Sequence, residues 1–205
     1  ATKTVVVNFY RQNQTIPPQL PITKFVDESF SVVGIVSSVG LPVEISASGA
    51  NCSAAISQNN AVVTFTGSGV CTLSFSQSGN DYYNQASLVT QEITVSKRPQ
   101  LISVTGMSSH ANYGAVIDIT ASASRMPILF TASGGCQLEG APTQNSARVK
   151  MTQVGTENCT VTFNQVGDTH YEAANEVVSK ITVDKAPQTI SVTKNAPEHG
   201  QIEGE

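Results

Sequence analysis

A stretch of 20 residues that occurs twice constrains this chain more than any other feature of its sequence. GSGVCTLSFSQSGNDYYNQA at 67–86 returns as GTENCTVTFNQVGDTHYEAA at 155–174. Self-similarity at a fixed period is typical of tandem domains, so we expect two copies of one module. A single offset of 88 residues relates Cys71 to Cys159, Phe75 to Phe163, Gly79 to Gly167, Tyr83 to Tyr171, and Ala86 to Ala174.

Both copies of the stretch begin with a strand that has one apolar face. Apolar residues occupy every second position and polar residues occupy the positions between them, a period of two that separates the two faces of a β-strand. Each module is therefore expected to bury one face of its sheets and to expose the other, as a β-sandwich does. The apolar residues are Cys71, Leu73 and Phe75 in the first copy and Cys159, Val161 and Phe163 in the second.

The period also predicts where the modules begin and end. QTI at 14–16, QLI at 100–102 and QTI at 188–190 mark equivalent points. They predict immunoglobulin-like domains over residues 12–97 and 98–185. Residues 1–11 resemble the end of a repeat and are interpreted as the last strand of a preceding one, or as an N-terminal extension. Residues 186–205 are interpreted as the start of a truncated third repeat, or as a tail.

The rest of each module contains short strands separated by turn residues. Pro42 and Pro127 mark equivalent strand beginnings, and a later hairpin is four residues longer in the second copy, where the cysteines are 23 instead of 19 positions apart. About seven strands without helical periodicity predict an all-β fold of two tandem immunoglobulin-like β-sandwiches. The modules join through SKRPQ at 96–100, a short proline-containing segment that predicts a stiff junction.

Four cysteines occur, two in each repeat. Four cysteines allow three pairings, and only Cys52 with Cys71 and Cys136 with Cys159 respects the repeat symmetry. The cysteines are too widely spaced for a zinc site and three histidines are scattered, so no metal is expected. Disulfides imply an oxidising compartment, which predicts an extracellular or cell-surface location.

Composition excludes two classes of partner. Only 13% of the residues are charged, and the net charge of −4 divides into −3 over residues 12–97 and −1 over 98–185. No segment is basic enough to bind nucleic acid through its charge. The longest apolar-looking stretch, at 30–43, is too short and too polar to span a bilayer, so no membrane insertion is expected.

The repeated motif resembles the bacterial immunoglobulin-like repeats of long secreted and cell-surface proteins. The resemblance rests on C-T-[LV]-[ST]-F-x-Q-x-G-[ND]-x-x-Y-x-x-A, followed by an ITV strand and PQ[TL]I, and covers both modules. It implies stalks, adhesins or accessory domains of secreted enzymes. Unlike antibody-type domains, this chain has no tryptophan, and the expected disulfides join the start of one strand to the repeated strand.

No constellation of residues predicts catalysis or a cofactor. Tyr83 and Tyr171 are expected to cover the end of the core, with sugar or partner stacking as the alternative. Calcium ligation by Asn80, Asp81 and Asp168 is a weaker alternative, because no dense acidic loop is present. His170, beside Asp168, is expected to be a surface residue, since Tyr82 occupies its place in the first copy.

Isopeptide crosslinks to asparagine are not expected, because a module with a disulfide has less need of one and residue types alone do not show them. The lysines considered are Lys24, Lys97, Lys150 and Lys185. The leading hypothesis is a non-catalytic stalk segment whose modules contact neighbouring repeats. The alternative is an adhesin-type module that contacts a host glycan or cell-surface protein. Residues 188–193, QTISVT, alternate like a strand, and we expect them to fold back onto the second module or to pair with a sheet edge of another molecule.

Overall fold

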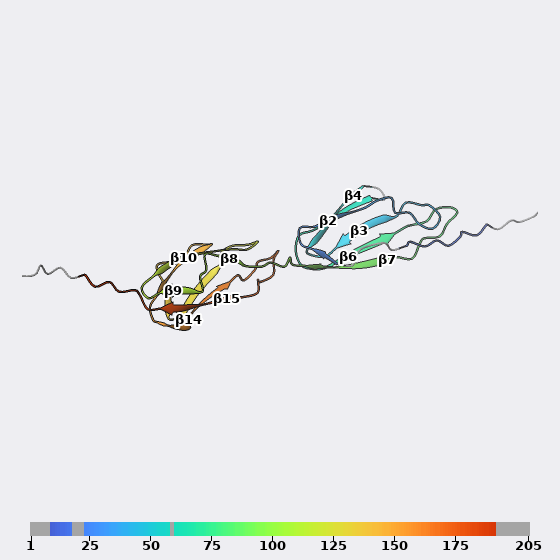
Figure 1. Ribbon diagram of the computed structural model, residues 1–205. Coiled ribbons are helices and arrows are strands. Elements are labelled where there is room, and N and C mark those ends of the chain that lie inside the picture. The colour runs from blue at the N-terminus through green and yellow to red at the C-terminus, as the bar shows by residue number, and fades with distance from the viewer. Residues whose placement is uncertain (1–8, 18–22, 58–59, 192–205) are drawn as a thin grey trace, which may run out of the picture. The chain divides into compact units, whose positions relative to one another are not determined.

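The computed structural model describes residues 9–17, 23–57 and 60–191, and within these ranges it consists of strands, turns and loops without a helix (Figure 1). The alternating sequence accounts for this, because a period of two buries one face of a strand and cannot form the apolar stripe of a helix. The strand expected within residues 1–10 falls outside these ranges except at its last two residues. Val192 and Thr193 of the expected tail strand also lie outside the described residues.

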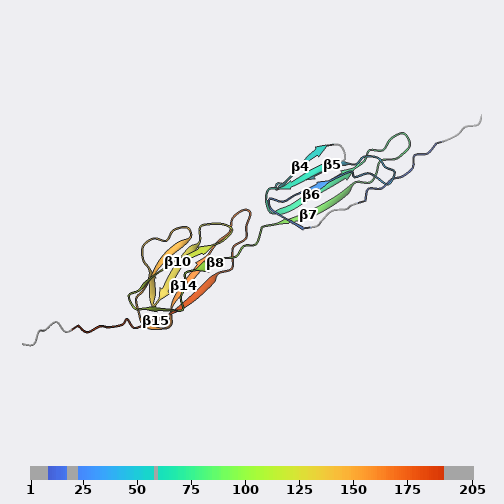
Figure 2. The same ribbon diagram turned by 45° about the horizontal axis from the view of Figure 1, so that its top comes forward.

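The first repeat forms a sandwich of two sheets, with strand orders β1-β7-β6-β3 and β2-β5-β4. Figure 2 shows β4 and β5 in one layer and β6 and β7 in the other. This is the sandwich predicted from the alternation. The strands are β1 (Thr23–Phe25), β2 (Ser29–Val32), β3 (Glu44–Ser48), β4 (Cys52–Ser57), β5 (Asn60–Phe65), β6 (Gly69–Ser76) and β7 (Val89–Ser96).

The second repeat forms the corresponding sandwich, with strand orders β11-β14-β15-β9 and β12-β13-β10-β8. Its longer hairpin comes from a shortened β12 and a loop over residues 139–145. The strands are β8 (Ser103–Thr105), β9 (His110–Asn112), β10 (Val116–Ser122), β11 (Leu129–Gly134), β12 (Cys136–Leu138), β13 (Ser146–Met151), β14 (Gly155–Asn164) and β15 (Val177–Asp184).

The predicted alternation of the repeated strand is confirmed in both copies. Cys71, Leu73 and Phe75 of β6 are at most 1% exposed, and the residues between them are half-buried. Cys159, Val161 and Phe163 of β14 are fully buried in the same way. Phe163 packs edge-on against Phe130, with ring centroids 5.6 Å apart. The repeated strand is therefore a central element of each core.

One feature of the sheets is absent from the sequence prediction. Short strands pair in parallel with the last strand of each repeat: Thr23 of β1 with Thr94, and His110 of β9 with Thr182. A two-residue turn follows each short strand, and its second residue is Asp27 at φ 65° in one copy and Gly114 at φ 79° in the other. Asp27 thus adopts a left-handed conformation that glycine adopts without strain.

The chain divides into two compact units, which are described separately. Unit 1 comprises residues 1–103, 122–128 and 164–176, and unit 2 comprises 104–121, 129–163 and 177–205. Unit 1 thus contains the whole first sandwich together with loops that belong in sequence to the second repeat. The sequence period instead predicts that residues 12–97 and 98–185 are the folding units, and this stays a prediction.

Residues 186–191, the described part of the segment interpreted as a third repeat or a tail, contain no strand. Residues 186–191 are exposed, and Ile190 is 91% exposed. The expected fold-back onto the second repeat is therefore absent from this part, and pairing with another molecule stays a prediction.

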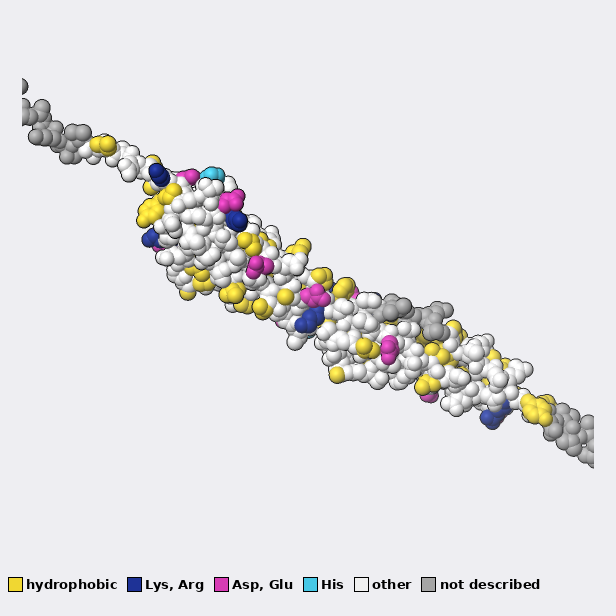
Figure 3. All heavy atoms as spheres, turned by 90° about the horizontal axis from the view of Figure 1, so that it is seen from below, with side chains coloured by type: hydrophobic (Ala, Val, Ile, Leu, Met, Phe, Trp, Pro, Cys, Tyr) yellow, Lys and Arg dark blue, Asp and Glu magenta, His cyan; other side chains and the backbone are white. Residues whose placement is uncertain are grey.

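Few charges lie on the surface. On the face shown in Figure 3, charged side chains stand apart among uncharged ones. Within the described ranges, no helix has the length and hydropathy needed to cross a bilayer.

Candidate functional site

Each repeat contains a disulfide that joins its two sheets. Cys52 at the start of β4 is bonded to Cys71 in β6, and Cys136 at the start of β12 is bonded to Cys159 in β14. β4 and β6 belong to different sheets, as do β12 and β14. Each bond thus joins the layers of a sandwich covalently near one end, and the described residues include no free cysteine.

A tight turn follows the repeated strand in both copies. In the first, Asn80 Oδ1 accepts hydrogen bonds from the backbone N–H of Tyr82 at 2.8 Å and of Tyr83 at 3.0 Å. In the second, Asp168 Oδ1 accepts the equivalent bonds from His170 at 2.7 Å and Tyr171 at 2.8 Å. Side chains of Asn and Asp stabilise turns in this way. Oδ1 of Asn80 and of Asp168, two of the three residues considered as calcium ligands, is therefore engaged in holding the turn.

Gly79 and Gly167 precede these turns with φ of 79° and 75°. A Cβ atom at Gly79 would lie 2.5 Å from the carbonyl oxygen of Tyr83, and one at Gly167 would lie 2.6 Å from that of Tyr171. Both positions therefore require glycine for backbone conformation and for space. Their recurrence in the sequence has a structural cause.

A buried pair of glutamines anchors the segment that enters each repeat. In the first repeat, Gln14 Nε2 donates to Gln77 Oε1 and to the carbonyl oxygen of Asn84, both at 2.7 Å. In the second, Gln100 Nε2 donates to Gln165 Oε1 and, at 2.7 Å, to the carbonyl oxygen of Glu172. All four glutamines are at most 9% exposed, and a buried amide needs such partners.

The pairing joins parts of the chain that are far apart in sequence. Gln12 forms an isolated parallel β-bridge with Tyr83, and Arg98 forms the equivalent β-bridge with Tyr171. The side-chain oxygen Oε1 of Gln100 accepts a hydrogen bond from the backbone N–H of Arg125 at 3.1 Å. The equivalent oxygen of Gln14 has no partner among the described residues. The motif is therefore more completely satisfied in the second copy.

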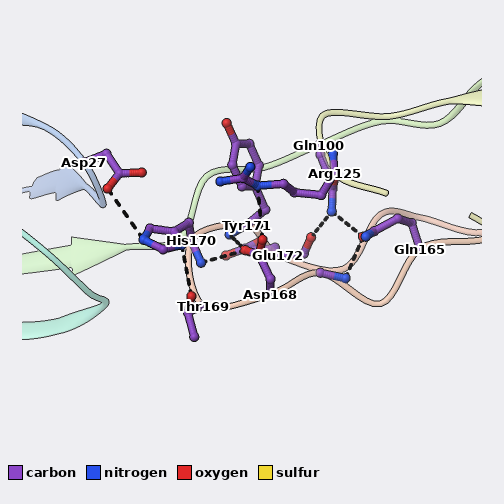
Figure 4. A network of polar contacts seen from close by, with 10 residues as sticks. Asp27, Gln100, Arg125, Gln165, Asp168, Thr169, His170, Tyr171 and Glu172 are labelled. Carbon is purple, nitrogen blue, oxygen red and sulfur yellow. Dashed lines mark hydrogen bonds and ion pairs between the residues drawn. The ribbon is translucent and has the colours of Figure 1, made fainter. Parts of the chain in front are cut away.

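The second copy adds a charged cluster beside the turn (Figure 4). Arg125 Nε lies 3.1 Å from Asp168 Oδ2, and its guanidinium lies over the ring of Tyr171, 4.8 Å from the centroid. The backbone N–H groups of His170 and Tyr171, followed by the positive charge of Arg125, lower the pKa of Asp168 below its usual range. Tyr171 is half-buried, and so is Tyr83. The two rings are therefore neither fully buried in the core nor fully exposed to solvent.

His170 has a different carboxylate neighbour from the one suggested by the sequence. Asp168, its local neighbour, binds the turn through Oδ1, and the imidazole Nε2 lies 3.6 Å from Asp27 Oδ1 within unit 1 (Figure 4). Thr169 Oγ1 lies 2.9 Å from His170 Nδ1. A hydroxyl, an imidazole and a carboxylate thus form a row. Thr169 and Asp27 are exposed, so this row lacks the water-excluded surroundings that strengthen electrostatic stabilisation in catalytic sites.

The remaining candidates have ordinary surroundings. No group of three or more His, Cys, Asp or Glu side chains that could hold a metal ion is present in the described ranges. None of Lys24, Lys97, Lys150 and Lys185 is buried, and Lys24 lies 3.8 Å from Glu28. Asp81 is exposed in the turn of the first copy.

Exposed aromatic rings distinguish the first copy from the second. Phe9 is 93%, Tyr10 is 85% and Tyr82 is 76% exposed. Together with Gln12, Asp81 and Tyr83 they line a hollow of about 330 Å³. His170 occupies the position of Tyr82 in the second copy, so the fold itself does not require a tyrosine there. This hollow is a candidate binding surface.

The sequence pattern predicted a structural role for the turn glycines and tyrosines. It did not predict the glutamine pairs or the aromatic hollow. Gln77 and Gln165 recur at the same offset of 88 residues, and Gln14 and Gln100 open the QTI and QLI segments. This recurrence is the signal that could have identified them. The hollow has no such signal, because Phe9 and Tyr82 are brought together only by the fold.

The strand pairing defines the class of this protein: tandem β-sandwiches, each with two sheets joined by a disulfide. Among solved structures it is similar to the D00-D0 domain of intimin, with 14% identity, a TM-score of 0.35, and coverage of 80% of this chain and 98% of that one. Fibronectin(III)-like modules of Clostridium thermocellum CbhA give 16% identity, a TM-score of 0.36, and coverage of 89% and 100%. The Yersinia pseudotuberculosis adhesin InvE gives 14% identity and a TM-score of 0.29, with coverage of 83% of this chain and 58% of that one.

These likenesses concern the fold alone, and the assignment of the fold rests on the strand order. No protein-family model and no curated protein matches the chain.

Proposed function

We propose that this chain is a non-catalytic structural segment of a large bacterial surface or secreted protein. Its immunoglobulin-like modules, each with an internal disulfide, would be stacked to hold a functional region away from the point at which the protein is attached. The disulfides support a location in an oxidising compartment. The sparsely charged, hydroxyl-rich composition supports a spacer function, because such a surface offers few anchors for a charged partner.

The observation that carries this proposal is the hydrogen bonding of residues 96–100, which connect the repeats. The carbonyl oxygen of Ser96 accepts from Val26 N–H at 3.0 Å. Arg98 N–H donates to His170 at 2.8 Å and its carbonyl oxygen accepts from Glu172 N–H at 2.9 Å. The Arg98 side chain donates from Nε to the carbonyl oxygen of Val26 at 2.9 Å. A flexible linker would leave these groups to water.

Amide hydrogen exchange tests whether the connecting segment is held. The Arg98 and Glu172 amides should exchange on the order of 100-fold more slowly than unstructured amides, because each donates to a backbone carbonyl. The amide of Gln188, which is exposed and outside any strand, is the internal control. Unprotected Arg98 and Glu172 amides would mean a flexible linker and would contradict the stalk proposal.

The aromatic hollow favours a second function, an adhesin-type module that contacts a host glycan or a cell-surface protein. Phe9, Tyr10 and Tyr82 present exposed rings beside the carboxylate of Asp81 and the amide of Gln12. Aromatic rings with a few polar groups are the usual lining of binding pockets, and about 330 Å³ lies at the small end of their range.

Glycan and protein arrays distinguish the two functions. Binding by this route should be reproducible with the whole chain and lost in Tyr82→His, which introduces the residue that the second repeat has at this position. Leu88→Ser, a change at another exposed apolar residue of the same repeat, is the matched control. Reproducible hits would overturn a purely structural role, and hits that survive Tyr82→His would place the binding surface elsewhere.

A further inference from the structure

The open edge of β4 is the least protected strand edge of the first repeat. β4 ends the order β2-β5-β4 and pairs on one side only, with Ala55 opposite Val62 of β5. Residues Ser53 to Ser57 include no charge and no proline, and among the described residues their other side has no hydrogen-bond partner. Natural proteins usually protect such an edge with charges, proline, bulges or a very short strand.

The equivalent strand of the second repeat has these protections. β12 comprises three residues against six in β4. Glu139 follows it, and Pro142 lies three residues further on. The same fold therefore accommodates a protected edge, and the fold does not require the open form found in β4.

The sheet face beside the edge differs between the repeats in the same direction. In the first repeat Ser31 of β2 lies opposite Val62, and Val62 is 46% exposed. In the second repeat the equivalent pair is Asp118 and Arg148, with Arg148 Nε 3.4 Å from Asp118 Oδ1. Ile56 of β4 and Val33, which follows β2, add exposed apolar surface to this sheet and are 51% and 76% exposed. The face is uncharged where its counterpart carries an ion pair.

We propose that this edge and face form a self-association surface, with β4 of one chain pairing antiparallel with β4 of a second copy. The pairing extends the sheet across a two-fold axis near Ala55 and places the uncharged faces of both copies side by side. A two-fold interface uses the same patch on both molecules, so one unprotected edge is sufficient. Strand addition supplies main-chain hydrogen bonds, and small side chains such as Ser53, Ala55 and Ser57 allow close approach.

The size of the surface predicts weak association. Six residues of β4 span about 20 Å, and the side chains that meet are small. Such a contact falls below the area of a stable dimer, about 1,200 Å², so a dissociation constant of about 10 µM to 1 mM is expected. Association of this strength becomes effective where many chains are held close together, as on a surface.

Sedimentation velocity of the whole chain at several concentrations up to about 1 mM tests the proposal. The wild type should show a dimer whose fraction rises with concentration. Ala55→Lys places a charge on the edge and should raise the dissociation constant at least about tenfold. Thr90→Lys adds the same charge on the exposed side of β7, a strand between β1 and β6, and should have no effect.

A second variant separates loss of association from loss of folding. Ala55→Glu and Ala55→Lys should each stay monomeric alone, and a mixture of the two should associate again, because opposite charges then meet near the two-fold axis and only folded chains could pair. The amides of Ala54 and Ile56, which face the open edge, should exchange more slowly as the wild-type concentration rises.

Three outcomes would overturn the proposal. The chain could stay monomeric throughout the concentration range. Association could persist in Ala55→Lys and in Ala55→Glu. Truncation after Lys185 could abolish association while β4 is intact, which would make residues 188–193 the pairing strand.

Discussion

At the scale of single residues, the buried glutamines are the side chains whose removal should have the clearest effect. Gln100→Ala removes two hydrogen bonds donated by the amide nitrogen and one accepted by its oxygen, including that from Arg125 N–H. Leaving buried groups without partners costs about 1–3 kcal/mol of the free energy of unfolding. Gln14→Ala should cost about 1 kcal/mol less, because the Gln14 oxygen has no partner to lose.

Urea unfolding of the two variants, followed separately in each repeat by NMR, measures this difference. Gln91→Ala is the control, since Gln91 Nε2 bonds only to the neighbouring carbonyl of Glu92. Equal losses in Gln14→Ala and Gln100→Ala would mean that the extra hydrogen bond from Arg125 contributes nothing.

Asp168 gives the second repeat a pH dependence that the first lacks. Its pKa is lowered in the folded chain mainly by the N–H groups of His170 and Tyr171. A carboxyl with a lowered folded pKa contributes stability above its unfolded pKa and loses it as the pH falls through the folded pKa. The second repeat should therefore lose stability below about pH 4 through this group. The equivalent Asn80 does not titrate.

Asp168→Asn tests this assignment with the residue type that holds the same turn in the first repeat. The amide oxygen still accepts the two N–H bonds, so the turn should be retained at neutral pH. Between about pH 5 and pH 2 the variant should lose less stability in the second repeat than the wild type does. The reading is wrong if urea midpoints of the variant and the wild type show the same dependence on pH.

At the scale of elements, the disulfides join strands of opposite sheets and should stabilise the two repeats almost equally. The closed loops span 19 and 23 residues. The chain-entropy estimate is about 3 kcal/mol for each and differs by only about 0.2 kcal/mol between them. Cys52→Ala with Cys71→Ala, and Cys136→Ala with Cys159→Ala, should lower the free energy of unfolding of their own repeats by similar amounts.

Urea unfolding of the two double variants measures these losses, and peptide mapping without reduction checks the pairing. A peptide linking Cys52 to Cys136 or Cys159, or free thiols throughout, would contradict both the pairing and the assignment to an oxidising compartment.

The same elements show how far the sequence predicts this fold. The alternation around Leu73 and Val161 predicts β6 and β14 because one face of a strand repeats every two residues. The pairing of β1 with β7 leaves no such signal, since three residues do not establish a period. The turn glycines were predicted from their recurrence. The glutamine pair was not, because Gln14 and Gln77 lie 63 positions apart and side-chain hydrogen bonds have no sequence period.

At the scale of the whole molecule, the sequence period and the compact units divide the chain differently. The period places a boundary between residues 97 and 98, whereas unit 1 also contains 122–128 and 164–176. Every strand of both sheets of the second sandwich lies within 98–185, as does its disulfide. The glutamine pair and the Asp168 turn lie there too. The sequence boundary therefore leaves each core complete.

We expect fragments 12–97 and 98–185 to fold independently. A core that keeps all its strands and its disulfide loses little when the rest of the chain is removed. Among the described residues, fragment 98–185 loses the contacts of His170 with Asp27 and of Arg98 with Val26, at exposed or half-buried side chains where such contacts contribute about 1 kcal/mol or less. Its melting temperature should therefore lie within about 8 °C of that of the second repeat in the whole chain.

Circular dichroism, NMR dispersion and thermal unfolding of each fragment, compared with the whole chain, measure this. Asp27→Ala in the whole chain is the matched control, because it removes the His170 contact without shortening the sequence. A folded 12–97 beside an unfolded 98–185 would mean that the loops at 122–128 and 164–176 depend on the first repeat for their structure, and the folding unit would then be compact unit 1 instead of the sequence repeat.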